Sequence, residues 1–321
     1  MLDKAAIPAN RKYLKSKKRE SLLKAILNYK YFYIMLIPIL VWYIVFCYAP
    51  MYGTTLAFKT YNYSKGIVGS PWIGFAHFKE ILSDFQYISA VKNTLIISFG
   101  KLILHFPIPI ILAILLNEIT KQRAKRFFQT TLTFPHFVSW VVLAGIITNI
   151  LGQNGVVNQI ITHFGMENVN FLSNPDTFRP VIYITHIWKE MGWDSIIYMA
   201  ALAGINPDLY EAADIDGANR WQKICNVTWP GIRPTVAIML ILYVGNMLNI
   251  GGSFDQILNL YSSPVYSVAD TIDTFIYRTT FTTGADFGYM TALGLLKSSV
   301  NLVMIYTANT IVKKSGEQGL F

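Results

Sequence analysis

The segment YEAADIDGANRWQKICNVTWP, residues 210–230, lies between two strongly apolar stretches of the chain. Asn206, which is followed by a proline, is a favourable N-cap for a short helix. Gly217 can adopt the left-handed conformation that ends such a helix. We expect a second helix to begin after Asn219 and to end at Pro230. A polar helical hairpin between two membrane spans has the shape of a docking element, although an ordinary connecting loop is the alternative.

The composition is that of a membrane protein. Of the 321 residues, 53% are hydrophobic and 14% are charged, and the mean hydropathy is +0.39. Six apolar segments are near or above the length of about 20 residues that crosses the hydrocarbon core. The sequence therefore predicts an all-α membrane protein with six transmembrane helices, at Tyr31–Met51, Val91–Leu116, Thr130–Leu151, Pro180–Ile205, Thr235–Ile250 and Phe287–Val312.

Lysine and arginine are distributed unevenly between the two sides that these spans define. The side that carries both termini has 18 of them, and the opposite loops have five. Because positive residues favour the cytoplasmic side, we expect both termini and the loop 206–233 to be cytoplasmic, in a bacterial plasma membrane. The net charge of +9 mostly reflects this bias. Anionic lipid headgroups explain the basic tail better than nucleic acid does.

The organisation expected from these patterns is simple. Residues 1–30 form a cytoplasmic basic tail, with an amphipathic interfacial helix over residues 13–30, and residues 31–321 form one transmembrane domain. No cleavable signal is expected, because the first apolar segment is a full span without a small-residue cleavage site. Cys47 falls in or near the outer half of the first span and Cys225 in the cytoplasmic loop, so the two cannot meet and no disulfide is expected.

Polar residues follow one face of the fourth predicted span. With the spacing of a helical face, this span carries His186, Lys189, Glu190, Trp193, Asp194 and Tyr198. Other spans add Lys101, Asn246 and Lys297. Lys101, Lys189, Glu190 and Lys297 are each about 9–10 residues from the outer end of their span, which places them near the bilayer middle. These residues are the predicted substrate path.

Charges at that depth cost at least about 2.5 kcal/mol each unless they are paired or hydrated. Two interpretations remain open and are compatible with each other. A water-filled cavity would hydrate the charges. Alternatively, pairs between helices, such as Glu190 with Lys101 or Lys297, would neutralise them.

Aromatic residues in these spans suit a sugar ligand, because the C–H face of a sugar packs on a ring while its hydroxyls bind polar side chains. The candidates are Trp140, Trp193, Tyr198 and Tyr243. Interfacial anchoring or ordinary packing is the alternative for each, since tryptophan and tyrosine are common in membrane proteins for those reasons.

The sequence contains no motif of an enzyme. It has no GxxxxGK[ST], so the chain holds no ATP by a P-loop, and it has no GxSxG, HExxH or Cys/His metal spacing. The five histidines are scattered along the chain. We therefore expect no catalytic residue, no metal and no cofactor in this chain.

The loop quoted above resembles the EAA loop of ABC importer permeases. Glu211-Ala212-Ala213 is followed after three residues by Gly217 and after nine more by Val227-Thr228-Trp229-Pro230. Valine and tryptophan stand where that pattern has isoleucine and leucine, two mild departures. In the family this loop docks into a cleft of the cytoplasmic ATPase and transmits its closure to the membrane. The resemblance assigns ATPase coupling to Glu211, Ala212, Ala213, Asp216, Gly217 and Pro230.

Residues from about 30 to 321 resemble one subgroup, the LplB-like carbohydrate permeases related to MalF. The stretches that carry this likeness include residues 65–74, 188–202 and 270–278 and the C-terminal Gly319-Leu320-Phe321. The resemblance implies the type I ABC importer permease fold. It also implies a second homologous permease, two ATPase subunits that hold ATP and Mg²⁺, an extracellular sugar-binding lipoprotein, and an oligosaccharide moved inward by alternating access.

Two rival functions come from other classes. An ion-coupled secondary sugar transporter could use Glu190 and Asp194 as its proton or sodium carboxylates, but it gives no reason for the Glu211 loop. A membrane enzyme that processes glycans is the second rival. ATP-dependent transport that needs a separate ATPase separates the importer from the ion-coupled transporter.

Overall fold

The computed structural model describes residues 28–250, 254–282, 286–316 and 319. The chain divides into two compact units, residues 1–56 and 57–321, and each is described by itself. Throughout the described ranges the regular elements are helical, apart from an isolated bridge between Lys59 and Trp72. The predicted all-α class is therefore confirmed. The interfacial helix expected over residues 13–30 falls almost entirely outside the described residues.

The first unit contains one long apolar helical segment. α2 (Lys30–Tyr43) continues through a π-helical turn, η1 (Ile44–Tyr48), into the 3-10 helix η2 (Ala49–Phe58). The whole segment is long and apolar enough to cross a membrane, as the first predicted span requires.

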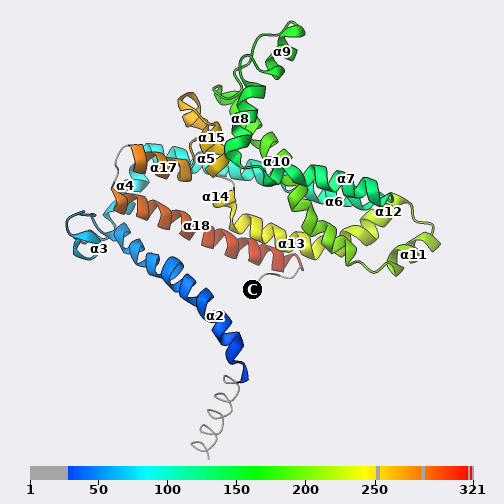
Figure 1. The fold of residues 1–321 in the computed structure, drawn as a ribbon, viewed down its shortest axis with the longest axis horizontal. Helices are drawn as coiled ribbons and strands as arrows, with labels where there is room; N and C mark the ends of the chain where they lie inside the picture. Colours follow the sequence, from blue (N-terminus) through cyan, green and yellow to red (C-terminus); the bar gives the residue numbers. More distant parts are fainter. Residues whose placement is uncertain (1–27, 251–253, 283–285, 317–318, 320–321) are drawn as a thin grey trace, which may run out of the picture. The chain divides into compact units, whose positions relative to one another are not determined.

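The second unit is a succession of helices joined by short connections (Figure 1). In chain order the α-helices are α3 (Gly66–Gly69), α4 (Ala76–Ser83), α5 (Phe85–His105), α6 (Pro107–Asn117), α7 (Gln122–Thr133), α8 (Trp140–Leu151), α9 (Val156–His163), α10 (Pro175–Ala203), α11 (Asp208–Ile215), α12 (Arg220–Lys223), α13 (Trp229–Gly245), α14 (Met247–Ile250), α15 (Phe254–Leu260), α16 (Tyr266–Ala269), α17 (Ile272–Thr282) and α18 (Phe287–Lys314). Turns of other helical types lie between them, at η3 (Phe134–Phe137), η4 (Ile224–Thr228) and η5 (Ser263–Val265).

Five helical segments among the described residues are long and apolar enough to cross a membrane by length and composition. They are Lys30–Phe58, Phe85–Asn117, Trp140–His163, Arg220–Gly245 and Phe287–Lys314. α10 has 29 residues and is also long enough, but it carries five acidic or basic side chains. Charged residues in a membrane helix face the protein interior. With α10 the number of spans is six, as the sequence predicts.

Two of the predicted spans are interrupted. Span two breaks at Phe106, between α5 and α6, where Pro107 begins the new helix. Span three was expected to be one helix over Thr130–Leu151, and this is wrong. α7 ends before Phe134, the backbone is extended at Val138, and the Ser139 side chain caps α8.

The fifth span also differs from its prediction. α12, η4 and α13 form one continuous helical segment, Arg220–Gly245, so the prediction that Pro230 ends the second helix of the loop is wrong. Pro230 lies in the first turn of α13, and the π-helical turn just before it accommodates the proline. The regular part of the span ends at Asn246 (φ −108°, ψ 13°), before the predicted end of the span at Ile250.

α10 is the central helix of the second unit. It packs against α5, α6, α7 and α13 (Figure 1). One apolar cluster joins Ile110 and Ala113 of α6 to Tyr198 and Leu202 of α10 and to Ile232 of α13. A second cluster joins α13 to α18. The helices that follow and precede the quoted loop are therefore packed against each other.

Gly192 allows α10 to approach α7 closely. A Cβ atom at this position would lie 2.1 Å from the carbonyl oxygen of Leu132 and 2.6 Å from the backbone nitrogen of Thr133. Both neighbours are backbone atoms, so a flexible side chain cannot move aside. Small residues at membrane helix interfaces allow this kind of contact.

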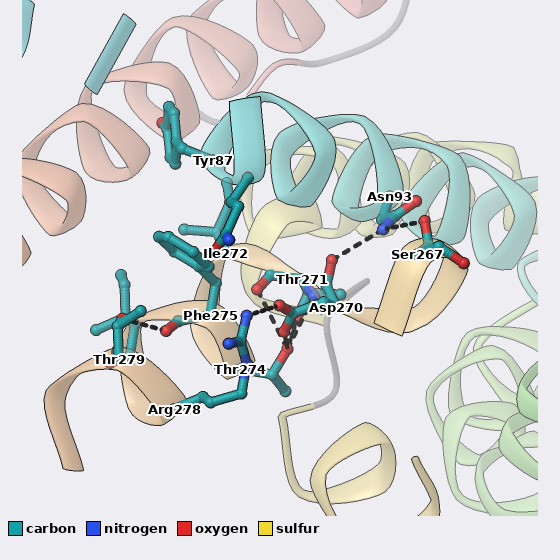
Figure 2. Close-up of polar contacts among 12 residues, drawn as sticks. Tyr87, Asn93, Ser267, Asp270, Thr271, Ile272, Thr274, Phe275, Arg278 and Thr279 are labelled. Carbon is teal, nitrogen blue, oxygen red and sulfur yellow. Dashed lines mark hydrogen bonds and ion pairs between the residues drawn. The ribbon is translucent and has the colours of Figure 1, made fainter. Parts of the chain in front are cut away.

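A polar network fastens the segment 266–278 to α5 (Figure 2). The Asn93 amide donates to the carbonyl oxygens of Ser267 and Asp270, both at 3.1 Å. The Asp270 carboxylate accepts from Thr274 at 2.8 Å and from Arg278 at 2.6 Å. The buried carboxylate is therefore paired and hydrogen-bonded, as its burial requires.

The same network extends to α10 through Arg179. Its guanidinium donates to the side-chain oxygen of Asn93 at 2.9 Å and to the carbonyl of Val268 at 3.1 Å. The backbone nitrogen of Ile272 donates to the Thr94 hydroxyl at 2.9 Å. α5, α10 and α17 are consequently linked by hydrogen bonds as well as by apolar contacts.

The quoted loop folds as two helical segments separated at Gly217, as its sequence predicts, but the second segment continues into α13. The Asn206 side chain accepts from the backbone nitrogen of Asp208, at the start of α11. Gly217 has φ +73° and separates α11 from α12. Asn219 and Gln222 form a reciprocal capping box at the start of α12.

Candidate functional site

One face of α10 borders a cavity of the second unit. His186, Glu190, Asp194 and Tyr198 recur every four residues and so lie on the same side of the helix. The cavity has a volume of about 630 Å³, within the range of about 300–1,000 Å³ typical of small-molecule sites. Its other walls come from α5, α6, α13, α18 and the residue after α13, through His105, Phe106, Pro109, Met239, Leu242, Tyr243, Gly245, Asn246 and Ile305.

Each carboxylate in the cavity wall contacts a histidine from another element. Asp194 Oδ2 is 2.8 Å from Nε2 of His105, in the last turn of α5. Glu190 Oε2 is 2.5 Å from Nδ1 of His136, in η3. Each contact is a hydrogen bond between a carboxyl oxygen and a histidine ring nitrogen. The pairs connect α10 to α5 and to η3.

Lys101 is almost fully buried in α5, and it does not line the cavity. Its ammonium donates to Oε1 of Gln256 at 2.8 Å. The Gln256 amide donates in turn to the carbonyl of Ile182 and to the hydroxyl of Thr185. Gln256 was not predicted as a partner of Lys101, because no sequence spacing connects it to α5.

The other lysines of the predicted path are also engaged. Lys189 donates to the carbonyl of His136 at 2.5 Å and lies 3.3 Å from Glu190. Lys297 pairs with Asp273 of α17 at 2.5 Å. Glu190 interacts electrostatically with Lys101, as one of the suggested pairings requires, whereas Lys297 pairs with Asp273 and not with Glu190. The salt-bridge contacts of Glu190 are with Lys189, the preceding residue of α10, and with His136 in η3. The sequence pattern does not connect His136 with Glu190 or Asp273 with Lys297.

The four aromatic candidates have different surroundings. Tyr198 and Tyr243 line the cavity. Trp193 stacks on the ring of His136, with the centroids 4.3 Å apart and the planes nearly parallel. Trp140 lies under the Lys189 ammonium, 5.6 Å from its ring centroid. The two tryptophans therefore pack around the Glu190 pair and do not line the cavity.

Three buried polar atoms on cavity-lining side chains have no hydrogen-bond partner within the described part of the chain. They are Nδ1 of His105, Nδ1 of His186 and the hydroxyl of Tyr243. The rings of the two histidines are 4.8 Å apart, and those of His105 and Tyr243 are 6.5 Å apart. Burying such atoms without a partner costs about 1–3 kcal/mol each, so water or a ligand is expected to satisfy them.

The residues of the predicted substrate path divide into two groups, those that line the cavity and those that do not. His186, Glu190, Asp194, Tyr198 and Asn246 line the cavity, whereas Lys101, Lys189, Trp193 and Lys297 do not. His105, which was not assigned to the predicted path, is also part of the wall. In the described ranges no group of three or more His, Cys, Asp or Glu side chains is arranged to hold a metal ion.

The predicted coupling residues lie on the hairpin after α10. Glu211, Ala212, Asp216, Gly217 and Pro230 are exposed, and Ala213 is half-buried. A hydrogen bond of 3.0 Å between the hydroxyls of Tyr210 and Thr228 connects α11 to η4. Lys223 and Asp214 form an ion pair across the hairpin. These two contacts stabilise the hairpin that carries the exposed coupling residues.

The chain is similar to known transport proteins over most of its length. Residues 105–315 match the family described as "Binding-protein-dependent transport system inner membrane component". The chain is 41% identical over 302 residues to the protein LplB of Bacillus subtilis (strain 168), covering 94% of each chain. It is 38% identical over 308 residues to the polygalacturonan/rhamnogalacturonan transport system permease protein YteP of the same organism, covering 96% of this chain and 95% of that protein.

A solved structure is similar over almost the whole chain. It is a crystal structure of a bacterial alginate ABC transporter in complex with an alginate pentasaccharide-bound periplasmic protein. One of its chains is 39% identical, with a TM-score of 0.84, and the match covers 93% of this chain and 99% of that one.

Proposed function

Because this chain belongs to the family of binding-protein-dependent transport system inner membrane components, we propose that it imports an oligosaccharide as one permease subunit of an ABC importer. The chain is a multi-pass membrane protein and a transport subunit, not an enzyme. Its relatives are named for the transport of polygalacturonan, rhamnogalacturonan and alginate, which supports a carbohydrate substrate. The ion-coupled alternative has no support in these similarities.

The observation that carries the proposal is that the exposed hairpin directly connects two helices that line the cavity. The hairpin begins where α10 ends and leads directly into α12 and α13. α10 and α13 are the two helices that contribute most of the cavity wall. A force applied to the hairpin can therefore move both walls, which is what coupling between an ATPase and a transport path requires.

The mechanism we propose is alternating access. A binding protein delivers the oligosaccharide from outside, and ATP-driven closure of the ATPase pair, relayed through residues 207–230, opens the cavity outward to receive it. ATP hydrolysis then returns the cavity to the inward-facing state. In this mechanism Glu211, Ala212, Ala213, Asp216, Gly217 and Pro230 make up the coupling surface.

The partners follow from the same proposal. A second homologous permease supplies the other half of the path, since one hairpin engages one ATPase subunit and closure involves two. The two ATPase subunits hold ATP and Mg²⁺, and an extracellular lipoprotein binds the sugar. We assign the chain to a bacterial plasma membrane, with a basic tail over residues 1–30, a permease domain over residues 31–321, and both termini cytoplasmic.

Reconstitution of the complete importer in proteoliposomes tests this proposal. We expect uptake of radiolabelled oligosaccharide to need ATP on the ATPase side and binding protein on the other, and to stop when the second permease is omitted. An ion gradient without ATP should drive no uptake. Uptake by this chain alone as a homodimer, or uptake that follows a proton or sodium gradient, would contradict the proposal.

A further inference from the structure

A second hollow of the second unit lies between α6 and the start of the helical segment Arg220–Gly245, which are side by side (Figure 1). It has a volume of about 390 Å³ and shares no lining residue with the cavity described above. We call it the α6 groove. Its lining consists of apolar side chains and one thiol, from Ile110, Ile111, Ile114, Leu115, Trp221, Ile224, Cys225 and Trp229.

The α6 groove is open to its surroundings. Leu115 is 60% exposed and Trp221 is 71% exposed, so the described part of the chain leaves both uncovered. In a protein that crosses the membrane, an exposed apolar surface of this kind faces either lipid or another protein.

The length of the groove favours lipid. From Trp221 to Trp229 the segment rises about 12 Å, close to the roughly 15 Å that one leaflet contributes to the hydrocarbon core. A transmembrane helix of a partner would instead need an apolar contact along both leaflets. The groove therefore matches one acyl chain of one leaflet.

Charged residues continue the two walls of the groove at one end. Arg220, the first residue of α12, precedes Ile224 by four residues and so continues the same face of its helix. Glu118 follows Ile114 by four residues at the end of α6. Both side chains are exposed. The segments 117–127 and 206–233 carry the excess of lysine and arginine, so this end of the groove is at the cytoplasmic surface.

The charged end decides which lipid fits. Hydrocarbon tails are as apolar as leucine, so an apolar lining alone does not distinguish one lipid from another. The Arg220 guanidinium is suited to a phosphate, which it can bind through two parallel hydrogen bonds. The Glu118 carboxylate can accept a hydrogen bond from the ammonium or hydroxyl group that a phospholipid carries beyond its phosphate.

We propose that the α6 groove binds one phospholipid of the cytoplasmic leaflet, with an acyl chain along the groove and the phosphate at Arg220. The groove includes part of the π-helical turn η4, which connects α12 of the hairpin to α13. The bound lipid therefore braces the connection between the exposed hairpin and the fifth span. The assignment to the cytoplasmic leaflet rests on the proposed function, through the orientation given there.

The first experiment fills the groove. Leu115→Trp puts a larger side chain at an exposed position of its wall, so each copy of this chain in the purified complex should retain one phosphatidylethanolamine fewer. Native mass spectrometry counts the retained lipids after delipidation and addition of phosphatidylethanolamine. Leu302→Trp on α18 is the matched control, because Leu302 is 70% exposed and lies outside the groove. Equal numbers of retained lipids in the two variants would overturn the proposed site.

The second experiment tests the phosphate. The unmodified complex should retain phosphatidylethanolamine better than a diacylglycerol with the same acyl chains, which has no phosphate. Arg220→Gln should reduce this preference about threefold, the effect of one exposed ion pair. Lys314→Gln, at an exposed position outside the groove, should leave it unchanged. An unchanged preference in Arg220→Gln would show that the lipid phosphate is not held at this end, and the proposal would be wrong.

Cys225 tests what covers the groove in the assembled complex. When Cys47 is replaced by serine, Cys225 is the remaining thiol of this chain, and its reaction with a maleimide can be followed by mass spectrometry. Phosphatidylethanolamine at ten times its Kd leaves about a tenth of the grooves empty, so the reaction should slow about tenfold. Ser315→Cys, at an exposed position after α18, should react equally fast with and without lipid. A Cys225 that is already shielded without lipid would show that a partner protein covers the groove, contrary to the proposal.

These measurements need no transport, so the two proposals fail separately. Absence of ATP-dependent uptake in proteoliposomes would contradict the proposed function and leave the lipid counts as they are. Uptake that is normal, together with equal lipid retention by Leu115→Trp and Leu302→Trp, would leave the importer standing and remove the lipid site.

Discussion

Glu190 and Asp194 are one helical turn apart on α10, and the histidines that contact them come from η3 and α5. Each pair lowers the cost of a carboxylate within the membrane by giving it a hydrogen-bond donor. The same contacts hold His105 and His136 in fixed orientations. The pairs therefore stabilise the packing of α10 against α5 and η3.

Gly192 offers a test of packing at a single residue. Gly192→Ala places a methyl group against the backbone of Leu132 and Thr133 in α7, so we expect a destabilisation of about 1–3 kcal/mol. In detergent the apparent melting temperature of the purified importer should fall by several degrees, roughly 2–4 °C per kcal/mol. Gly145→Ala is the control, because nothing lies within 4 Å of a Cβ there. Equal melting temperatures would show that α7 moves aside at no cost.

The residues of the α10 face were predictable from the sequence, and their partners were not. Spacing alone places His186, Glu190, Asp194 and Tyr198 on one side of a helix. Which side chain reaches a carboxylate depends on how elements distant in the chain pack. His136 in a 3-10 turn and Gln256 beyond α14 carry no sequence signal that connects them to α10 or α5.

Among the elements, the hairpin formed by α11 and α12 was predicted best, because its signals are local. An asparagine cap, a glycine with positive φ and a second asparagine cap each act over three or four residues. The breaks at Val138 and Asn246 were missed, because each lies within an apolar run that reads as one continuous span. The break at Phe106, by contrast, coincides with Pro107, which begins α6.

Gly217 tests the coupling role of this hairpin. Gly217→Val forces a β-branched residue into φ +73°, which distorts the turn between α11 and α12. We expect uptake to fall at least about tenfold, and loaded binding protein to stimulate ATP hydrolysis less or not at all. The six spans should still insert, as protein yield in the membrane fraction would show.

The control for this variant is Gly145→Val, at a helical glycine with open space around it and no positive φ. It should transport normally. Normal uptake, with normal ATPase assembly and stimulation, in Gly217→Val would remove the hairpin from the coupling mechanism and leave it as an ordinary loop.

For the whole chain, the fold class and the number of spans followed from composition and length, because the thickness of a bilayer fixes the length of its helices. The cavity was only partly predictable. Its polar residues could be identified on separate helices, but their common location depends on the packing of α5, α10 and α13. The family relationship agrees with the position of the exposed hairpin between two helices that line the cavity.

The orientation of the chain in the membrane gives the last prediction. With 18 lysines and arginines on the side of the termini and five on the other, the loop containing Ser64 should be external and the segment containing Ser315 cytoplasmic. Both residues are exposed. In a variant with Cys47 and Cys225 replaced by serine, Ser64→Cys should react with a membrane-impermeant maleimide in intact cells. Ser315→Cys should react only after the membrane is permeabilised. The opposite pattern would place the Glu211 hairpin outside, where no ATPase could reach it, and would contradict both the orientation and the coupling role.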